Sequence, residues 1–142
     1  SLSKNNYFKN TFQIGHHSRF DLLKIDRKKT IQSVLVVNGP SSYSKYLLSH
    51  FSKQLNNNQI QYIIGGPHVR KEMNCHNTEA VFIPNTDMEK ADEVMGKAQE
   101  ICGYFGYSTL MDCKALSCSF NLIPTPGQLE QIYLSKLHKK SP

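Results

Sequence analysis

The clearest hydrophobic pattern in the chain predicts a strand, a helix and a second strand in its first half. Residues 30–37 (TIQSVLVV) are rich in β-branched side chains and end in four consecutive apolar positions, which is typical of a strand covered on both faces. In residues 43–55 apolar side chains recur every four positions, as on one face of an amphipathic helix. Residues 59–64 (QIQYII) predict the second strand. A unit of this length predicts parallel strands joined by a right-handed crossover.

The second half of the chain predicts further elements of both kinds. Residues 68–78 are polar and predict a connection, and residues 79–84 (EAVFIP) predict a third short strand. Residues 85–106 carry apolar side chains at steps of three and four, which favours one long helix. Residues 107–123 predict two strands, and the alternation in the second is typical of an antiparallel strand or a sheet edge. A last helix is predicted to begin at Thr125, because threonine is a common N-cap residue and the proline that follows it suits the first helical position.

Together these elements predict an α/β protein of order β-α-β-β-α-β-β-α, with an α+β arrangement as the alternative. We expect a single-domain sandwich in which a mixed sheet of about five strands packs against about three helices. The domain is expected to span residues 30–142, and residues 1–29 are expected to form a basic, partly flexible segment. The chain begins at Ser1 rather than Met, so we interpret it as one domain of a larger protein.

The net charge of +6 over 142 residues is concentrated at the N-terminus. Seven of the 17 basic residues but only two of the 11 acidic residues lie in the first 30 positions, so the remainder is almost neutral. A basic segment of this kind is most often solvated, and the alternative is contact with a protein partner. We do not expect nucleic-acid binding, because no aromatic side chains interleave the basic ones in a known motif.

Apolar runs and cysteine usage narrow the class of protein. The longest apolar runs are far shorter than the roughly 20 residues that span a bilayer, so we expect no membrane span. The cysteines lack the spacing of a disulfide framework, which favours a reducing compartment and a cytoplasmic location. A zinc site could draw only on Cys75, His76, Cys113 and Cys118. We expect no metal there, because a zinc site normally shows a close CxxC-type pair.

Two loops of the predicted strand–helix–strand unit carry the most suggestive chemistry. They are NGPSS at 38–42 and GGPHVRK at 65–71, and parallel neighbouring strands would bring both to one edge of the sheet. A helix start offers free backbone N–H groups to an anion, and glycines let a ligand approach the backbone closely. Arginine is the best side-chain fork for phosphate. The candidate ligand-binding residues are Asn38, Gly39, Ser41, Ser42, Gly65, Gly66, His68, Arg70 and Lys71.

Neither loop matches a motif of high specificity. The first lacks the GxxxxGK[ST] pattern of a P-loop and the GxGxxG pattern of dinucleotide sites. Glycine, proline and serine also occur at ordinary strand ends, so a plain turn is the alternative interpretation. Residues 63–69 (IIGGPHV) resemble a loop of cobalamin-binding modules attached to radical enzymes. The ligand motif DxHxxG of that family is absent, and no role is carried over from it.

The sequence therefore predicts a small α/β domain that binds a phosphate-bearing, nucleotide-like ligand at the ends of its first two strands. The alternative is a non-catalytic module for protein–protein interaction within a larger assembly. In that case the basic N-terminal segment or the alternating strand at 116–122 would make the contact. No GxSxG serine or HExxH pair is present, so whether the domain is an enzyme, and with which cofactor, stays open.

Overall fold

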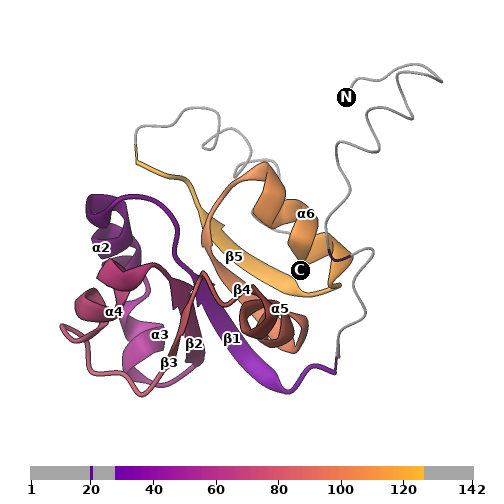
Figure 1. The fold of residues 1–142 in the computed structure, drawn as a ribbon, viewed down its shortest axis with the longest axis horizontal. Helices are drawn as coiled ribbons and strands as arrows, with labels where there is room; N and C mark the ends of the chain where they lie inside the picture. Colours follow the sequence, from indigo (N-terminus) through magenta and orange to yellow (C-terminus); the bar gives the residue numbers. More distant parts are fainter. Residues whose placement is uncertain (1–19, 21–27, 127–142) are drawn as a thin grey trace.

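The centre of the molecule is one five-stranded sheet in which all strands are parallel (Figure 1). The computed structural model describes residue 20 and residues 28–126. The strands follow the order β3-β2-β1-β4-β5 across the sheet. Their bounds are β1 Ile31–Val36, β2 Ile60–Gly65, β3 Val81–Pro84, β4 Ala98–Tyr104 and β5 Ser119–Ile123.

Helices cover both faces of this sheet and make three layers (Figure 1). The helices among the described residues are α2 Ser41–His50, α3 Ser52–Asn56, α4 Pro67–Met73, α5 Met88–Gly96 and α6 Tyr107–Ala115. The chain moves from β1 to β3 in one direction and then from β3 through β4 to β5 in the other. Because crossovers between parallel strands are right-handed, this reversal places α2, α3 and α4 on one face and α5 and α6 on the other.

Two hydrophobic clusters correspond to the two faces. The first joins β1 and β2 to α2, α3 and α4, with Leu35, Leu47 and Ile63 fully buried in it. The second joins the sheet to α5 and α6 and includes Val34 and Phe20. Phe20 is completely buried, although it lies eleven positions before the start of the first strand. The core therefore includes a side chain from the N-terminal basic segment.

The strand–helix–strand unit predicted in the first half is confirmed. β1 and β2 are neighbours and run parallel, with Val34 opposite Tyr62 and Val36 opposite Ile64. β1 lies at the middle of the sheet, so both of its faces are covered, which explains its continuous apolar run. The helix predicted at 43–55 is present as α2 and α3, which are separated at Phe51. The third strand, predicted at 79–84, is β3.

The prediction of one helix over residues 85–106 was wrong in its second half. α5 ends at Gly96, and β4 follows directly at Ala98–Tyr104. β4 pairs with β1 on one side and β5 on the other, so it is buried on both faces and shows no alternation. Its apolar residues happen to continue the helical spacing of α5, so periodicity alone could not separate a buried strand from a helix.

The prediction of two strands over residues 107–123 and of a mixed sheet was also wrong. Residues 107–115 form α6, and β5 at Ser119–Ile123 runs parallel to β4. Parallel neighbours cannot be joined by a tight turn, so a crossover helix is required between them. The alternation in β5 did indicate an edge strand correctly, since β5 is the last strand of the sheet.

The predicted number of helices was also too low in the middle of the chain. The polar connection expected at 68–78 contains α4, which begins at Pro67 with proline in its first turn. The helix predicted to begin at Thr125 lies outside the described residues, except for its first positions. Within residues 28–126, no helix is both long enough and apolar enough to cross a membrane.

We predict that Gly103→Ala destabilises the fold by about 1–3 kcal/mol, the usual range for overpacking a core. A Cβ atom on Gly103 would lie 2.8 Å from the carbonyl oxygen of Val36 on the neighbouring strand. Urea denaturation measures the free energy of unfolding. Gly106→Ala is the matched control, because nothing lies within 4 Å of a Cβ atom at that position. Equal stabilities for the two variants would show that the β1–β4 spacing is not this tight.

Candidate functional site

The most promising site for a ligand lies at the carboxyl ends of β1 and β4. These strands are parallel neighbours, with Val36 opposite Gly103. The chain leaves β1 for α2 on one face of the sheet and leaves β4 for α6 on the other face. A crevice forms between two such diverging loops, and ligands of open α/β sheets bind at this switch in strand order.

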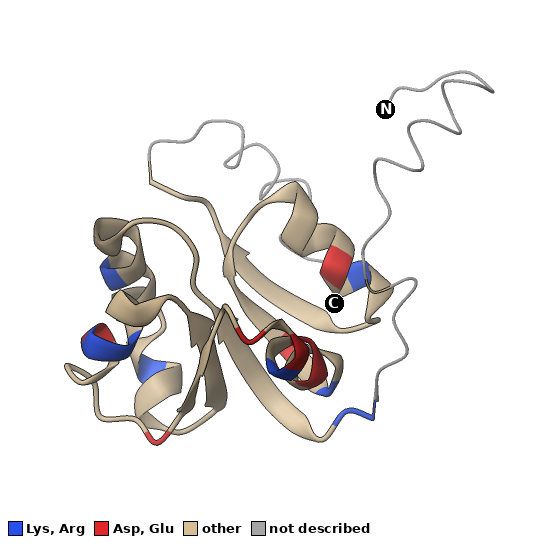
Figure 2. Cartoon of the chain, viewed as in Figure 1, with Lys and Arg blue, Asp and Glu red and all other residues tan. Residues whose placement is uncertain are grey.

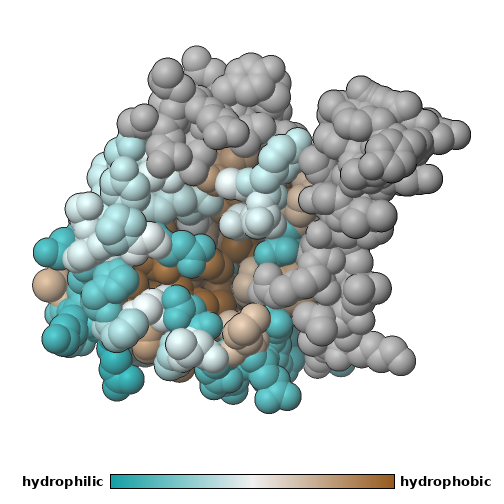
Figure 3. All heavy atoms as spheres, turned by 45° about the horizontal axis from the view of Figure 1, so that its top comes forward, coloured by the Kyte–Doolittle hydropathy of each residue, from teal (hydrophilic) through white to brown (hydrophobic). Residues whose placement is uncertain are grey.

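A crevice of about 300 Å³ is present at this position. It begins at the loop after β1, extends across the last residue of β4 and reaches the start of α6. Figure 3 turns toward the viewer the side on which the strands end, and apolar residues are visible there between polar ones. The residues that line the crevice are Asn38, Gly39, Pro40, Tyr43, Tyr104, Phe105, Gly106, Thr109 and Thr125.

Two helices begin at this crevice, and both lack a side-chain cap from the described residues. The N-cap positions are Pro40 for α2 and Gly106 for α6. The carbonyl of Pro40 accepts the N–H groups of Tyr43 and Ser44, and that of Gly106 accepts the N–H group of Leu110. The N–H groups of Ser41 and Ser42 in α2, and of Ser108 and Thr109 in α6, precede these in the first turns, at positions where a helix start offers N–H groups to an acceptor outside the helix. The positive ends of two helix dipoles therefore converge on one crevice.

Gly39 makes the turn that lets α2 start beside the crevice. Its φ is +97°, a left-handed conformation that side chains with a Cβ atom rarely adopt. Pro40 follows it with φ of −71°, which suits the residue that precedes the first helical turn. The sequence Asn-Gly-Pro thus fixes the direction in which the N–H groups of α2 point.

Tyr104 and Tyr43 form one wall of the crevice. The Tyr104 hydroxyl donates a hydrogen bond of 2.5 Å to the backbone carbonyl of Tyr43, and the two rings meet edge to face with centroids 6.1 Å apart. Burial, together with the nearby phenols of Tyr46 and Tyr43, raises the pKa of Tyr104 to about 12. The Tyr104 hydroxyl is therefore a neutral donor that fixes the start of α2 to the end of β4.

A second cavity of about 290 Å³ adjoins the crevice on the α5 and α6 side. Asn38 and Thr109 line both cavities. The second cavity also contains Asp92 and Asp112, which are only 8% and 9% exposed. Its lining combines apolar side chains with two carboxylates and two amides, so it suits neutral or cationic groups of a ligand better than phosphate.

The serines of the first predicted loop are engaged by an acidic residue of α4. The Ser41 hydroxyl donates to Glu72 Oε2 over 2.6 Å, and the Ser44 hydroxyl lies 2.5 Å from Glu72 Oε1. Ser44 is fully buried and Glu72 is 9% exposed. Ser42 is exposed in the same first turn. A carboxylate thus occupies the side of α2 that faces α4, beside serines that had been expected to bind an anion.

The glycines of the second predicted loop serve the packing of α4. A Cβ atom on Gly65 would lie 2.9 Å from Val69 Cγ2, so the glycine permits α4 to approach the end of β2. Gly66 is the N-cap of α4, and a Cβ atom there would lie 3.3 Å from His68 Cε1. The Nε2 atom of His68 is buried without a hydrogen-bond partner among the described residues. These residues belong to a helix start rather than to an extended loop.

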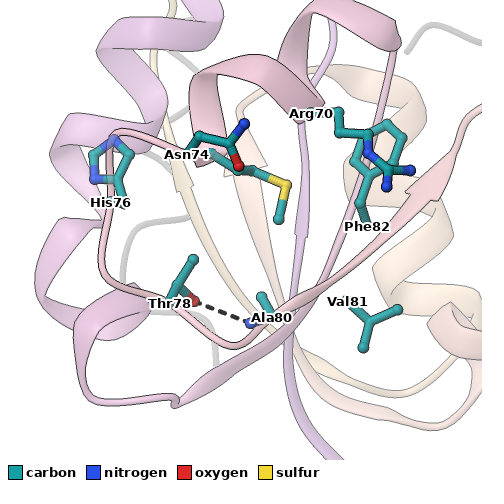
Figure 4. Close-up of a pocket in the computed structure, with 8 residues that line it drawn as sticks. Arg70, Asn74, His76, Thr78, Ala80, Val81 and Phe82 are labelled. Atoms are coloured by element: carbon teal, nitrogen blue, oxygen red, sulfur yellow. Dashed lines mark hydrogen bonds between the residues drawn. The ribbon is translucent and has the colours of Figure 1, made fainter.

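Arg70 and Lys71 do not reach the crevice. Both lie in the last turn of α4 and are exposed. The Arg70 guanidinium lies 6.0 Å from the centre of the Phe82 ring, over the edge strand β3 (Figure 4). It lines a groove of about 450 Å³ together with Asn74, His76 and other residues of that edge. Of the nine predicted residues, the structure therefore brings Asn38 and Gly39 into the crevice.

Tyr104, Gly106 and Thr109 were missed as site residues by sequence reasoning. They lie at the end of β4 and the start of α6, a region that the spacing had assigned to a helix and a strand. A signal was present in the segment GYFGYST at 103–109, because an apolar run that ends in glycine before serine and threonine is typical of a strand that leads into a helix.

Charge is distributed unevenly around the crevice (Figure 2). Lysine and arginine lie on α2, α3 and α4, whereas acidic residues gather on α5. None of the residues lining the crevice carries a formal charge. Over residue 20 and residues 28–126, no three His, Cys, Asp or Glu side chains are grouped so that they could hold a metal ion. Electrostatic attraction for an anion would therefore come from helix dipoles and backbone N–H groups.

Comparison with known proteins does not identify a ligand or a function for this site. The chain matches no protein-family model, no curated protein and no solved structure at a significant level. The site is accordingly defined by its geometry alone, as the crevice between the starts of α2 and α6.

We predict that Glu72→Ala destabilises the protein by about 1–3 kcal/mol, because it leaves a buried serine hydroxyl without its charged acceptor. Ser44 would retain only the carbonyl of Ser41, 2.9 Å from its oxygen. Glu79→Ala is the matched control, since that acidic residue is exposed. Thermal unfolding of both variants measures the difference, and equal melting temperatures would contradict a structural role for the Glu72 carboxylate.

We predict that Tyr104→Phe lowers the free energy of unfolding by about 1 kcal/mol, through loss of the hydrogen bond to Tyr43. Because the pKa of Tyr104 is raised to about 12 in the folded protein, the folded state holds this proton longer than the unfolded state. Stability should therefore be complete below about pH 10, the pKa of an unfolded tyrosine, and should fall as the pH rises toward about 12.

Phenolate absorbance at alkaline pH tests this assignment. When the absorbance of each protein is plotted against pH, the wild-type curve should show one more tyrosine that titrates at high pH than the Tyr104→Phe curve. Tyr46→Phe serves as the control, because Tyr46 is 50% exposed. If Tyr104→Phe removed a tyrosine that titrates near the ordinary value of about 10, the part-buried hydrogen bond to Tyr43 would be refuted.

Proposed function

We propose that this domain binds a phosphate-bearing, nucleotide-like ligand in the crevice between the starts of α2 and α6. The ligand class is the one expected from the sequence. The proposed binding site differs from the expected one by one strand: it lies at the ends of β1 and β4 instead of the ends of β1 and β2.

The single observation that carries the proposal is the convergence of two uncapped helix N-termini on one crevice. Pro40 and Gly106 are the N-caps, and each is a residue whose side chain cannot accept a backbone N–H group. Both N-caps and the left-handed Gly39 line the crevice. Backbone N–H groups at a helix start are well suited to bind phosphate oxygens, and glycine permits close approach.

The dimensions and lining of the crevice favour a small nucleotide. A volume of about 300 Å³ is at the lower end of the range for small-molecule sites, so it suits a mononucleotide better than a dinucleotide. Tyr43 and Tyr104 offer aromatic surface to a base or ribose. The amide of Asn38 and the hydroxyl of Thr109 can donate hydrogen bonds from either side.

The opposite side of α2 is a poorer place for phosphate. The Glu72 carboxylate is 2.6 Å from the Ser41 hydroxyl, so an anion bound there would meet a negative charge. The Arg70 guanidinium cannot compensate for this, because it lies over Phe82 at the edge strand. These contacts support the β1–β4 crevice over the β1–β2 edge.

A second candidate function is binding of a protein partner along the edge of the sheet. β5 is an edge strand, and Ser119 and Asn121 on it are exposed. An extended segment of a partner could pair with such an edge. The basic segment at residues 1–29, which was the other candidate contact, lies outside the described residues except for residues 20, 28 and 29.

Amide chemical shifts during titration with ATP, NAD and inorganic phosphate test the proposed function. Shifts should concentrate in residues 38–43 and 104–109, with residues 70–76 as an internal control on the other groove. Shifts confined to residues 65–71 would restore the site expected from sequence. No shifts at millimolar concentrations of any of the three probes would refute the proposal.

We predict that Thr109→Glu weakens binding of the phosphate probe by about tenfold or more, because like charges 5 Å apart at the protein surface repel by about 3 kcal/mol. Thr109 is the third residue of α6, where an acidic side chain favours the helix dipole, so the fold should persist. The Thr109→Gln variant introduces a side chain of nearly the same size as glutamate but without its charge. It should bind the phosphate probe within about threefold of wild type.

Calorimetric dissociation constants for wild type, Thr109→Glu and Thr109→Gln decide the outcome. Equal binding by the glutamate and glutamine variants would place the phosphate elsewhere. Thermal unfolding of both variants establishes that any loss of binding does not come from loss of structure.

A further inference from the structure

The turn after α6 has a defined geometry that brings two cysteines together. The N–H group of Cys118 donates to the carbonyl of Cys113 over 3.1 Å, and the N–H group of Ser117 donates to that of Lys114 over 3.2 Å. Ser117 has a φ of +54°, in the left-handed region. These two hydrogen bonds around a left-handed residue define a Schellman motif, the common way for a helix to end.

A Schellman motif places two particular side chains in contact. The residue after the left-handed position packs against the residue five positions before it, and in most helices this contact is apolar. Here the two residues are Cys118 and Cys113. The Cys118 sulfur lies 3.7 Å from the Cys113 carbonyl oxygen, which fixes the thiol above the end of α6.

The two thiols differ in their exposure. Cys113 is fully buried in the core cluster of α5 and α6. Cys118 is half-buried and packs against the same cluster from the surface. A small oxidant can therefore reach the Cys118 thiol before it reaches the Cys113 thiol, which is buried beneath the surface.

We propose that Cys113 and Cys118 form an oxidisable dithiol, which a hydroperoxide converts to a disulfide across the end of α6. The backbone hydrogen bond between these two residues holds their main chains together, so we expect closure to require side-chain rotation rather than movement of the helix.

The charges around Cys118 favour its role as the attacking sulfur. Lys29 is fixed nearby, since its ammonium donates to the carbonyls of Leu116 over 2.7 Å and of Gly96 over 3.2 Å. The hydrogen bond from Cys113 and the positive charge of Lys29 lower the pKa of the Cys118 thiol against the effect of its burial. The same hydrogen bond, with burial, raises the pKa of Cys113. The thiolate is the reactive form, so Cys118 reacts before Cys113.

The reaction is balanced over two steps. The Cys118 thiolate attacks one oxygen of the hydroperoxide, the O–O bond breaks, and a sulfenic acid forms while the leaving oxygen takes up a proton. The Cys113 sulfur then attacks the Cys118 sulfur, the S–O bond breaks, and water leaves with the Cys113 proton. The two thiols lose two electrons, and the peroxide gains them.

The remaining cysteines provide internal controls. Cys102 is 1% exposed, and burial beside Glu100 raises its pKa, so it should stay reduced. Cys75 is exposed in the turn after α4 and reports the reactivity of an accessible thiol. A reaction specific to the Schellman pair must consume Cys113 and Cys118 together and spare Cys102.

Trypsin makes the test direct, because Lys114 lies between the two cysteines. Cleavage yields peptides 98–114 and 115–136, which stay joined only if a disulfide links them. After mild hydrogen peroxide, alkylation of free thiols and digestion, we expect the joined pair by mass spectrometry. Alkylation of Cys113 and Cys118 should fall about tenfold or more and recover after treatment with dithiothreitol.

Variants of the same full-length chain assign the roles. Cys102→Ala should keep the joined pair, which shows that the partner in peptide 98–114 is Cys113. Cys113→Ala should accumulate a sulfenic acid at Cys118, detected as a dimedone adduct, whereas Cys118→Ala should give no adduct at Cys113. The inference is overturned if Cys113 and Cys118 of the wild-type protein are still free for alkylation after treatment with peroxide concentrations that oxidise Cys75. It is equally overturned if Cys118 reaches the sulfinic acid without linking to Cys113.

Discussion

Parallel pairing of β1 with strands on both of its sides is the constraint on which the rest of the molecule depends. β2 pairs with one side of β1 and β4 with the other, although β4 is separated from β1 by three helical crossovers and two strands. The pairing with β4 is close, since Gly103 has no room for a side chain next to Val36. Because the chain must return across the sheet to make this pair, helices cover both faces and the loops after β1 and β4 diverge. The crevice is a direct consequence of that divergence.

Sequence reasoning was reliable where the structure is local and failed where it is not. The unit from β1 to β2 was predicted because its apolar spacing changes clearly between strand and helix. β4 was not predicted, because a strand that is buried on both faces loses its alternation, and the spacing of Ala98, Cys102 and Phe105 fits a helix equally well. The error in α6 followed, since a parallel β5 can be inferred only after β4 is placed.

The same distinction explains the candidate site. Asn38 and Gly39 were found because they end a strand that was predicted correctly. Arg70 and Glu72 are only two positions apart in the sequence, but helical rotation directs Arg70 toward β3 and Glu72 toward α2. A cluster of charges along the chain is therefore divided between two surfaces, and no sequence pattern shows this until the start of α4 is known.

Phe20 changes where the folding unit begins. Basic and polar residues surround it in the sequence, and by composition the first 29 residues looked like an appendage to the domain. Its ring is nevertheless completely buried among the apolar side chains of α5 and α6. A shortened chain that started at the first strand would leave a cavity the size of a phenyl ring, at a cost of about 3–5 kcal/mol. For any recombinant version of this domain, the N-terminal boundary is set by a packed side chain and not by the change in charge.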